Sequence, residues 1–122
     1  MPHTWGRVKE FAHPARTFCD YDKPRKPPSA AEIAWVAATL GMRPLWCRLD
    51  RTRRGWHLIV QWQQKRNGRW RAADLKPAEA VAIQAILGSD PKREALNLMR
   101  TMSDYDAAGR RRWNILYAEK IT

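Results

Sequence analysis

The chain is 122 residues long and carries 23 Lys and Arg against 12 Asp and Glu, a formal net charge of +11. A chain of this length forms a single domain, residues 1–122, and it contains no apolar run near the roughly 18 residues of a membrane span, so we expect a cytoplasmic protein with no membrane partner. The excess positive charge predicts a polyanionic partner, first of all nucleic acid, and the alternative is a heavily solvated surface.

The amino-terminal part is expected to contain at least one strand. Residues 1–15 form either an extra strand, around residues 5–11, or a flexible arm. Residues 16–22 have the pattern of an extended segment. The basic, proline-rich linker 22–29 (DKPRKPPS) follows, and its prolines disfavour helix in the residues before them.

A helix begins directly after this linker. Ser29 and Glu32 form a capping box, and Gly41 can end the helix. The apolar residues recur at i, i+3, i+4 and i+7, which predicts one buried stripe of Ile33, Val36, Ala37 and Leu40.

A hairpin is predicted next, with strands at 45–50 and 55–62 joined by the arginine-rich tip 51–54. Strand alternation assigns its side chains to two faces. Leu45, Cys47, Leu49, Leu58 and Val60 face the core, whereas Trp46, Arg48, Asp50, His57, Ile59 and Gln61 face outward. We interpret residues 63–73 as a polar loop; the alternative is a second hairpin, in which Asn67-Gly68 turns the chain and 69–73 pairs back as a short strand.

Two helices and a strand complete the chain. The first helix covers about 77–87, with Pro77 in its first turn and Gly88 as its stop. The second is capped by Asp90, and its expected buried stripe is Ala95, Leu98, Met99 and Met102. The last strand, 113–118, completes the sheet. This order predicts an α+β fold of the ferredoxin-like or RRM-like type, an antiparallel sheet with its helices on one face.

Two aspartates, Asp20 and Asp22, occupy alternate positions of the first strand. Side chains alternate across a strand, so both carboxylates share a face and can hold a divalent cation through oxygen ligands. The alternative is a solvated strand end that pairs with Lys23, Arg25 or Lys26. Spacing alone does not decide, because Asp104 and Asp106 repeat the pattern in an expected loop.

The open face of the sheet joins these aspartates to residues of the hairpin. Both cysteines stand in apolar stretches and are expected to be buried thiols. If Cys19 packs inward like Cys47, the aspartates share the open face with His57, Arg48 and Trp46. For His57 the alternative is a half-buried hairpin residue that is hydrogen-bonded to a neighbour.

This arrangement resembles the archaeo-eukaryotic primase superfamily. A D-x-D at a strand end, here Asp20 and Asp22, is followed by a helix and by a hairpin whose second strand begins with Arg54-Gly55-Trp56-His57. The resemblance implies that the carboxylates bind the Mg²⁺ or Mn²⁺ ions of phosphoryl transfer, and that His57 contacts the nucleotide phosphates as part of the catalytic set. Such chemistry depends on charge neutralisation and in-line positioning.

The match covers about residues 16–62 and departs from the family in two respects. The family has a third acidic residue on a later strand, for which Glu119 at the chain's end is the candidate metal ligand here. The family also has an additional α/β unit before the first motif, and residues 1–19 leave no room for one.

Basic and aromatic residues alternate at several places in the chain, which is typical of proteins that stack bases and hold a phosphate backbone. The alternatives are that most of the tryptophans belong to the core and that the arginines serve loop solubility. The candidate nucleic-acid-binding residues are Trp46, Arg48, Arg51, Arg53, Arg54, Trp56, Lys65, Arg66, Arg69, Trp70, Arg110, Arg111 and Arg112.

We therefore expect a nucleic-acid-binding protein with a trimmed primase-like core that binds single-stranded or junction DNA in the replication of a phage or mobile element. The sequence does not distinguish DNA from RNA. An alternative is a metal-dependent primase or nucleotidyl transferase that uses Asp20, Asp22 and His57. A third is a basic protein that inhibits or scaffolds another protein.

Overall fold

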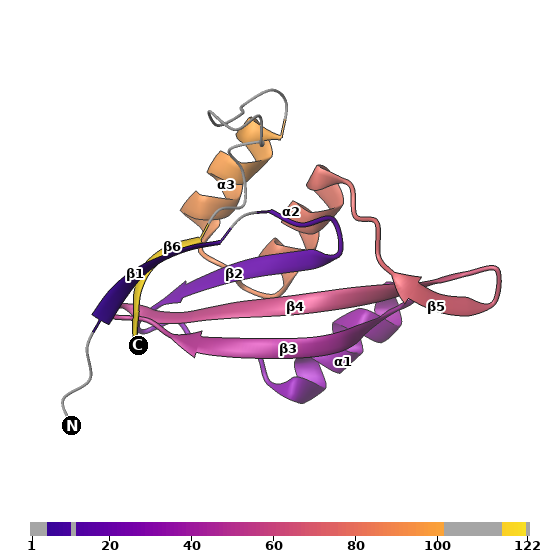
Figure 1. Ribbon diagram of the computed structural model, residues 1–122, viewed down its shortest axis with the longest axis horizontal. Coiled ribbons are helices and arrows are strands. Elements are labelled where there is room, and N and C mark those ends of the chain that lie inside the picture. The colour runs from indigo at the N-terminus through magenta and orange to yellow at the C-terminus, as the bar shows by residue number, and fades with distance from the viewer. Residues whose placement is uncertain (1–4, 11, 102–115, 122) are drawn as a thin grey trace.

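The computed structural model describes residues 5–10, 12–101 and 116–121, and the side chains from Ala12 to Thr101 (Figure 1). Its strands and helices follow the expected order, and the two strands that the sequence indicated as alternatives are both formed, one in residues 5–10 and one after the hairpin. In chain order they are β1 (Trp5–Glu10), β2 (Arg16–Asp22), α1 (Ala30–Thr39), β3 (Met42–Arg51), β4 (Gly55–Arg66), β5 (Arg69–Ala72), α2 (Pro77–Ile86), α3 (Pro91–Arg100) and β6 (Leu116–Ile121).

The strand β4 is the centre of a four-stranded antiparallel sheet. β2 pairs with its first half and β3 pairs along its other edge. β5 joins the second half of β4 on the β2 side, after a tight turn in which Asn67 and Gly68 adopt φ angles of 52° and 73°. Residues 63–73 therefore form a hairpin and not a polar loop, because a turn with two positive φ angles suits the twist of paired strands.

The hydrophobic core lies between one face of this sheet and the helices. α1 packs on β3 and α2 packs on β2, and both helices contribute to a single buried cluster. Its members include Cys19, Tyr21, Ile33, Val36, Leu58, Val60, Trp62, Val81, Ile83 and Leu87. The expected α+β fold, a ferredoxin-like antiparallel sheet with helices on one face, is thus confirmed.

The cap of α1 is formed as the sequence predicts. The Oγ of Ser29 accepts a hydrogen bond from the backbone N–H of Glu32 at 3.1 Å and donates one to the Glu32 carboxylate. Gly41 follows the helix with a φ of 66°, a conformation that favours glycine. Leu40, the last residue of the expected stripe, is exposed at the C-cap.

The last strand does not join the main sheet. We expected 113–118 to complete it; residues 113–115 lie outside the described residues, and β6 pairs with β1 in a separate two-stranded ribbon. β6 contacts β3, and Figure 1 shows the ribbon near the end of the sheet where β2 and β3 finish.

The outer edge of β2 is occupied by side chains of α2, of α3 and of the turn between them, which explains why no strand of the described residues pairs there. Gln84 accepts from the Phe18 N–H at 2.9 Å, and Arg93 donates to the Phe18 carbonyl at 2.6 Å. Ser89 accepts from the Asp20 N–H at 3.0 Å. These contacts satisfy backbone groups that a neighbouring strand would otherwise bind.

A buried carboxylate holds this edge network together. Glu94 of α3 accepts hydrogen bonds from Gln84 at 2.6 Å, from Ser89 at 2.7 Å, from Arg93 at 2.6 Å and from Asn97 at 3.0 Å. The buried side of α3 is therefore polar. The expected apolar stripe was wrong: Ala95, Leu98 and Met99 are exposed, Met99 to 72%, and Met102 lies outside the described residues.

Three residues of β3 also differ from expectation. Leu45 lies at a β-bulge between Pro44 and Trp46, and it is exposed. Cys47 and Leu49 project towards the helix side, as expected, but both are exposed because β3 is the outer strand and α1 covers only part of it. Only Cys19 is a buried thiol, and burial raises its pKa to about 12.

The opposite face of the sheet is only partly open. Phe18 and Ile59 are each 2% exposed and form a small second cluster against which Trp46 packs. Among the described residues, no helix has the length and apolar character that crossing a membrane requires.

Candidate functional site

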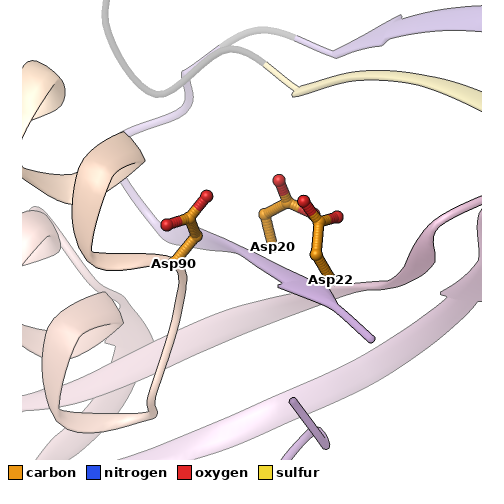
Figure 2. Close-up of side chains that lie close together, drawn as sticks. All are labelled: Asp20, Asp22 and Asp90. Atoms are coloured by element: carbon orange, nitrogen blue, oxygen red, sulfur yellow. The ribbon is translucent and has the colours of Figure 1, made fainter. Parts of the chain in front are cut away.

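Three aspartates meet at one end of the partly open face. Asp20 and Asp22 come from β2, and Asp90 comes from the N-terminus of α3 (Figure 2). One carboxylate oxygen from each lies within 4.8 Å of the other two. Figure 2 shows all three carboxylates pointing to the same side of β2. Oxygen ligands at this spacing suit Mg²⁺, which proteins hold through a few carboxylates while water and substrate phosphates complete the shell.

Backbone contacts fix this convergence. The N–H of Asp90 donates to the carbonyl of Asp20 at 2.9 Å, which joins the start of α3 to the edge of β2. Oδ1 of Asp90 accepts from the N–H of Lys92 at 3.1 Å as the helix cap. The cap uses one oxygen of the carboxylate, so the other oxygen can serve as a ligand.

A glycine brings β4 close to the second aspartate. Gly55 pairs with Asp22, and a Cβ at position 55 would lie 1.7 Å from the backbone oxygen of Tyr21. Only glycine allows this approach. The close approach of the two backbones therefore explains why position 55 in Arg54-Gly55-Trp56-His57 is a glycine.

The three carboxylates repel one another. Burial, and then the neighbouring Asp20 and Asp90, raise the pKa of Asp22, while Arg54 and His57 act in the opposite direction. Within the described residues, no Lys or Arg side chain forms an ion pair with any of the three aspartates. A divalent cation would relieve this repulsion.

His57 lies underneath Asp20. Its Nε2 is 3.3 Å from Oδ1 of Asp20, and its side chain is 2% exposed. Nδ1 is buried and has no hydrogen-bond partner within the described part of the chain. The sequence placed His57 on the correct face, but the burial of its ring puts it in a position to orient Asp20 rather than to meet solvent.

Sequence reasoning missed the third carboxylate. We interpreted Asp90 only as a helix cap, and the contact that brings it to Asp20 is between residues 70 apart in the chain. A capping aspartate directly after a helix stop is the one local signal that pointed to it. Glu119 pairs with Arg7 in the β1–β6 register, and its side chain lies outside those described.

The basic residues do not gather in one place. The tip Arg51, Arg53 and Arg54 adjoins the carboxylates, because Gly55 pairs with Asp22. Lys65, Arg66, Arg69 and Trp70 lie at the other end of β4, on the β4–β5 hairpin (Figure 1). Arg110, Arg111 and Arg112 lie outside the described residues.

The candidate residues also differ in the face that they occupy. Trp46 and Arg48 stand on the partly open face, where Nε of Arg48 donates to Oδ2 of Asp50 at 3.0 Å. Trp56 packs against the core on the helix side, which removes it from the aspartates' face. Two arginines that we did not predict, Arg16 and Arg43, stand on the same face as Trp46.

Comparisons of this chain with protein-family models, with curated proteins and with solved structures gave no match.

Proposed function

We propose that the chain binds nucleic acid and contacts its phosphates partly through a divalent cation, Mg²⁺ or Mn²⁺, held by Asp20, Asp22 and Asp90. The convergence of three carboxylates within 4.8 Å is the observation that carries this proposal. Phosphates and carboxylates repel each other, so a strand can approach this end of the sheet only when a cation lies between them.

The surroundings of the carboxylates support the same function. Arg51, Arg53 and Arg54 are exposed on the adjoining hairpin tip, where they can meet phosphates that extend beyond the cation. The net charge of +11 favours a polyanion over a neutral or acidic partner. The resemblance to archaeo-eukaryotic primases, through Asp20, Asp22 and Arg54-Gly55-Trp56-His57, points to a role in the replication of a phage or mobile element.

The test is the affinity for a labelled single-stranded oligonucleotide in Mn²⁺ and in EDTA at equal ionic strength. We expect tighter binding in Mn²⁺, and we expect Asp20→Asn with Asp22→Asn to lose that difference, with an affinity in EDTA at least equal to that of the wild type because two repelling charges are gone. Asp74→Asn with Glu79→Gln, two exposed acids, is the charge-matched control. Equal affinity of the wild type in Mn²⁺ and EDTA would contradict the proposal.

Nucleotidyl transfer is the second candidate function, favoured by the third carboxylate. Two or three acids around divalent ions supply the charge neutralisation that in-line attack by a 3′ hydroxyl requires. Incorporation of labelled nucleotides on a primed template with Mn²⁺, lost in Asp90→Asn, is the expected result. Absence of incorporation by the wild type would leave binding as the function.

A further inference from the structure

Two arginines on the partly open face are held in the same unusual way. In the first case, Arg16 of β2 donates its Nε–H to Oε1 of Gln61 on β4 at 2.7 Å. Its guanidinium carbon lies 5.2 Å from the ring centroid of Trp46 on β3. Gln61 is in register with both Arg16 and Trp46, so the three side chains form a row across three strands.

A second row lies two residues further along β4, and its tryptophan, Trp70, pairs with Lys65 and is therefore diagonal to Gln63. Arg43 of β3 donates its Nε–H to Oε1 of Gln63 at 2.8 Å, and its guanidinium carbon lies 4.5 Å from the ring centroid of Trp70 on β5. We name the six side chains of the two rows the Arg-Gln-Trp platform: Arg16, Gln61, Trp46, Arg43, Gln63 and Trp70. A strand rises about 3.3 Å per residue, so the two rows are about 7 Å apart.

Each guanidinium keeps its terminal nitrogens available. Within the described part of the chain, the guanidinium of neither Arg16 nor Arg43 makes a hydrogen bond other than that from Nε. The Gln oxygen and the indole ring fix the plane of the group, and the two Nη atoms form the fork that binds phosphate in a bidentate way. Such fixed donors lose little entropy when they bind.

The charge around the platform has one sign. The ammonium of Lys65 lies 5.5 Å from the ring centroid of Trp70, and Arg43 and Lys65 are exposed. Among the described residues on this face, the acids Asp20, Asp22 and Asp50 all lie at the other end of the sheet. The charged side chains near the platform on this face are therefore all positive, and they attract an anion that binds there.

We propose that the Arg-Gln-Trp platform binds the phosphates of a single-stranded nucleic acid that runs along β4 towards the three aspartates. This proposal rests on the proposed function, and it adds the path that the bound strand follows across the sheet. From Gln61 to His57, beside Asp20, is four residues, about 13 Å along the strand. A few nucleotides span both sites.

A single strand fits this platform better than a duplex. The two rows are about 7 Å apart along β4, with one arginine from each side of that strand, and a flexible single-stranded backbone can adjust its phosphates to such an offset pair. In B-DNA the phosphates of one strand follow a helical path that curves away from the surface of a sheet.

The experiment measures anisotropy of a labelled 12-nucleotide oligothymidylate in EDTA over a range of salt concentrations. Arg16→Ala with Arg43→Ala is expected to weaken binding roughly tenfold at moderate salt and to reduce the log-log salt slope by about 1.4, since each phosphate contact on a single strand contributes about 0.7. Arg71→Ala with Lys92→Ala is the control; both side chains are exposed, and Arg71 projects from the helix side of β5.

A second variant changes the platform without changing its charge. Gln61→Leu with Gln63→Leu keeps both arginines but removes the oxygens that orient them, so we expect weaker binding with an unchanged salt slope. The proposal is overturned if the arginine variant binds like its control, or if duplex DNA binds as tightly as the single strand. The use of EDTA separates the two proposals. Binding in EDTA tests the platform, whereas the additional affinity in Mn²⁺ tests the three aspartates.

Discussion

The aspartates of the candidate metal site are held by their neighbours before any ligand arrives. Asp20 has His57 beneath it, and Asp90 is fixed as a helix cap. Asp22 has a raised pKa because of burial and of the other two carboxylates. Local repulsion that persists in a folded protein is typical of sites that gain a ligand.

The raised pKa of Asp22 makes a prediction about pH. Its ionised form is less favourable in the folded than in the unfolded chain, so its contribution to stability is present below the ordinary value of 3.8 and is lost as the pH rises through the folded pKa. Asp22→Asn should therefore raise the melting temperature by about 2 °C at pH 7 in EDTA.

Thermal unfolding followed by circular dichroism checks this. The difference between Asp22→Asn and the wild type should shrink as the pH falls towards 4, and it should reverse at pH 7 when Mn²⁺ is present. A variant that melts below the wild type at pH 7 in EDTA would mean that the carboxylate is stabilised by a partner in the metal-free protein.

His57 should act through Asp20. Removing a side chain that orients a metal ligand typically lowers metal affinity 10- to 100-fold, and we expect this loss for His57→Ala. His57→Gln can place an amide N–H near Oδ1 of Asp20 and should restore part of the affinity. Calorimetric titration with Mn²⁺ measures both, and urea unfolding checks that each variant is folded. Unchanged affinity in folded His57→Ala would remove the residue from the site.

At the level of elements, the edge of β2 shows why the site has its shape. Polar side chains from α2 and from the turn before α3 bind the outer backbone groups of β2, so α3 begins beside Asp20 and brings Asp90 to it. The Glu94 carboxylate accepts four hydrogen bonds within this network. The contacts that occupy the outer edge of β2 in place of a neighbouring strand therefore also bring the third carboxylate to the other two.

Glu94→Gln tests that connection. The Glu94 carboxylate is buried and accepts four hydrogen bonds, and an amide would turn a donor towards two of these donors, so the free energy of unfolding should fall by about 3 kcal/mol. Asp74→Asn, at an exposed position, should change it by less than about 0.5 kcal/mol. Urea unfolding of both variants gives the comparison. A loss for Glu94→Gln no greater than for Asp74→Asn would show that the network does not hold α3 against β2.

The elements that could be predicted from sequence are those with local signals. The capped helix after Ser29, the long hairpin and the shared face of Asp20, Asp22 and His57 follow from caps and strand alternation. The polar underside of α3 could not be predicted, because Leu98 and Met99 have the spacing of a buried stripe and only the contacts with β2 reverse it. Asp90 was missed for the same reason.

On the scale of the whole molecule, the described acids of the partly open face lie at one end of it. Acids and His57 occupy one end of β4, a small apolar cluster of Phe18 and Ile59 follows, and the Arg-Gln-Trp platform occupies the other end. This division could not be read from the composition, since the net charge of +11 gives no position. The position of each of these groups on the face follows from the register in which β2, β3 and β5 pair with β4.

Calorimetric titration of Mn²⁺ into the wild type, Asp90→Asn and Asp74→Asn tests the central claim most directly. Asp90 was found through the structure alone, so its effect does not depend on the Asp20-Tyr21-Asp22 pattern. We predict that the wild type and Asp74→Asn bind the ion with equal affinity and that Asp90→Asn binds it at least about tenfold more weakly. Equal affinity in Asp90→Asn, or no binding by the wild type, would contradict a metal site formed by the three aspartates.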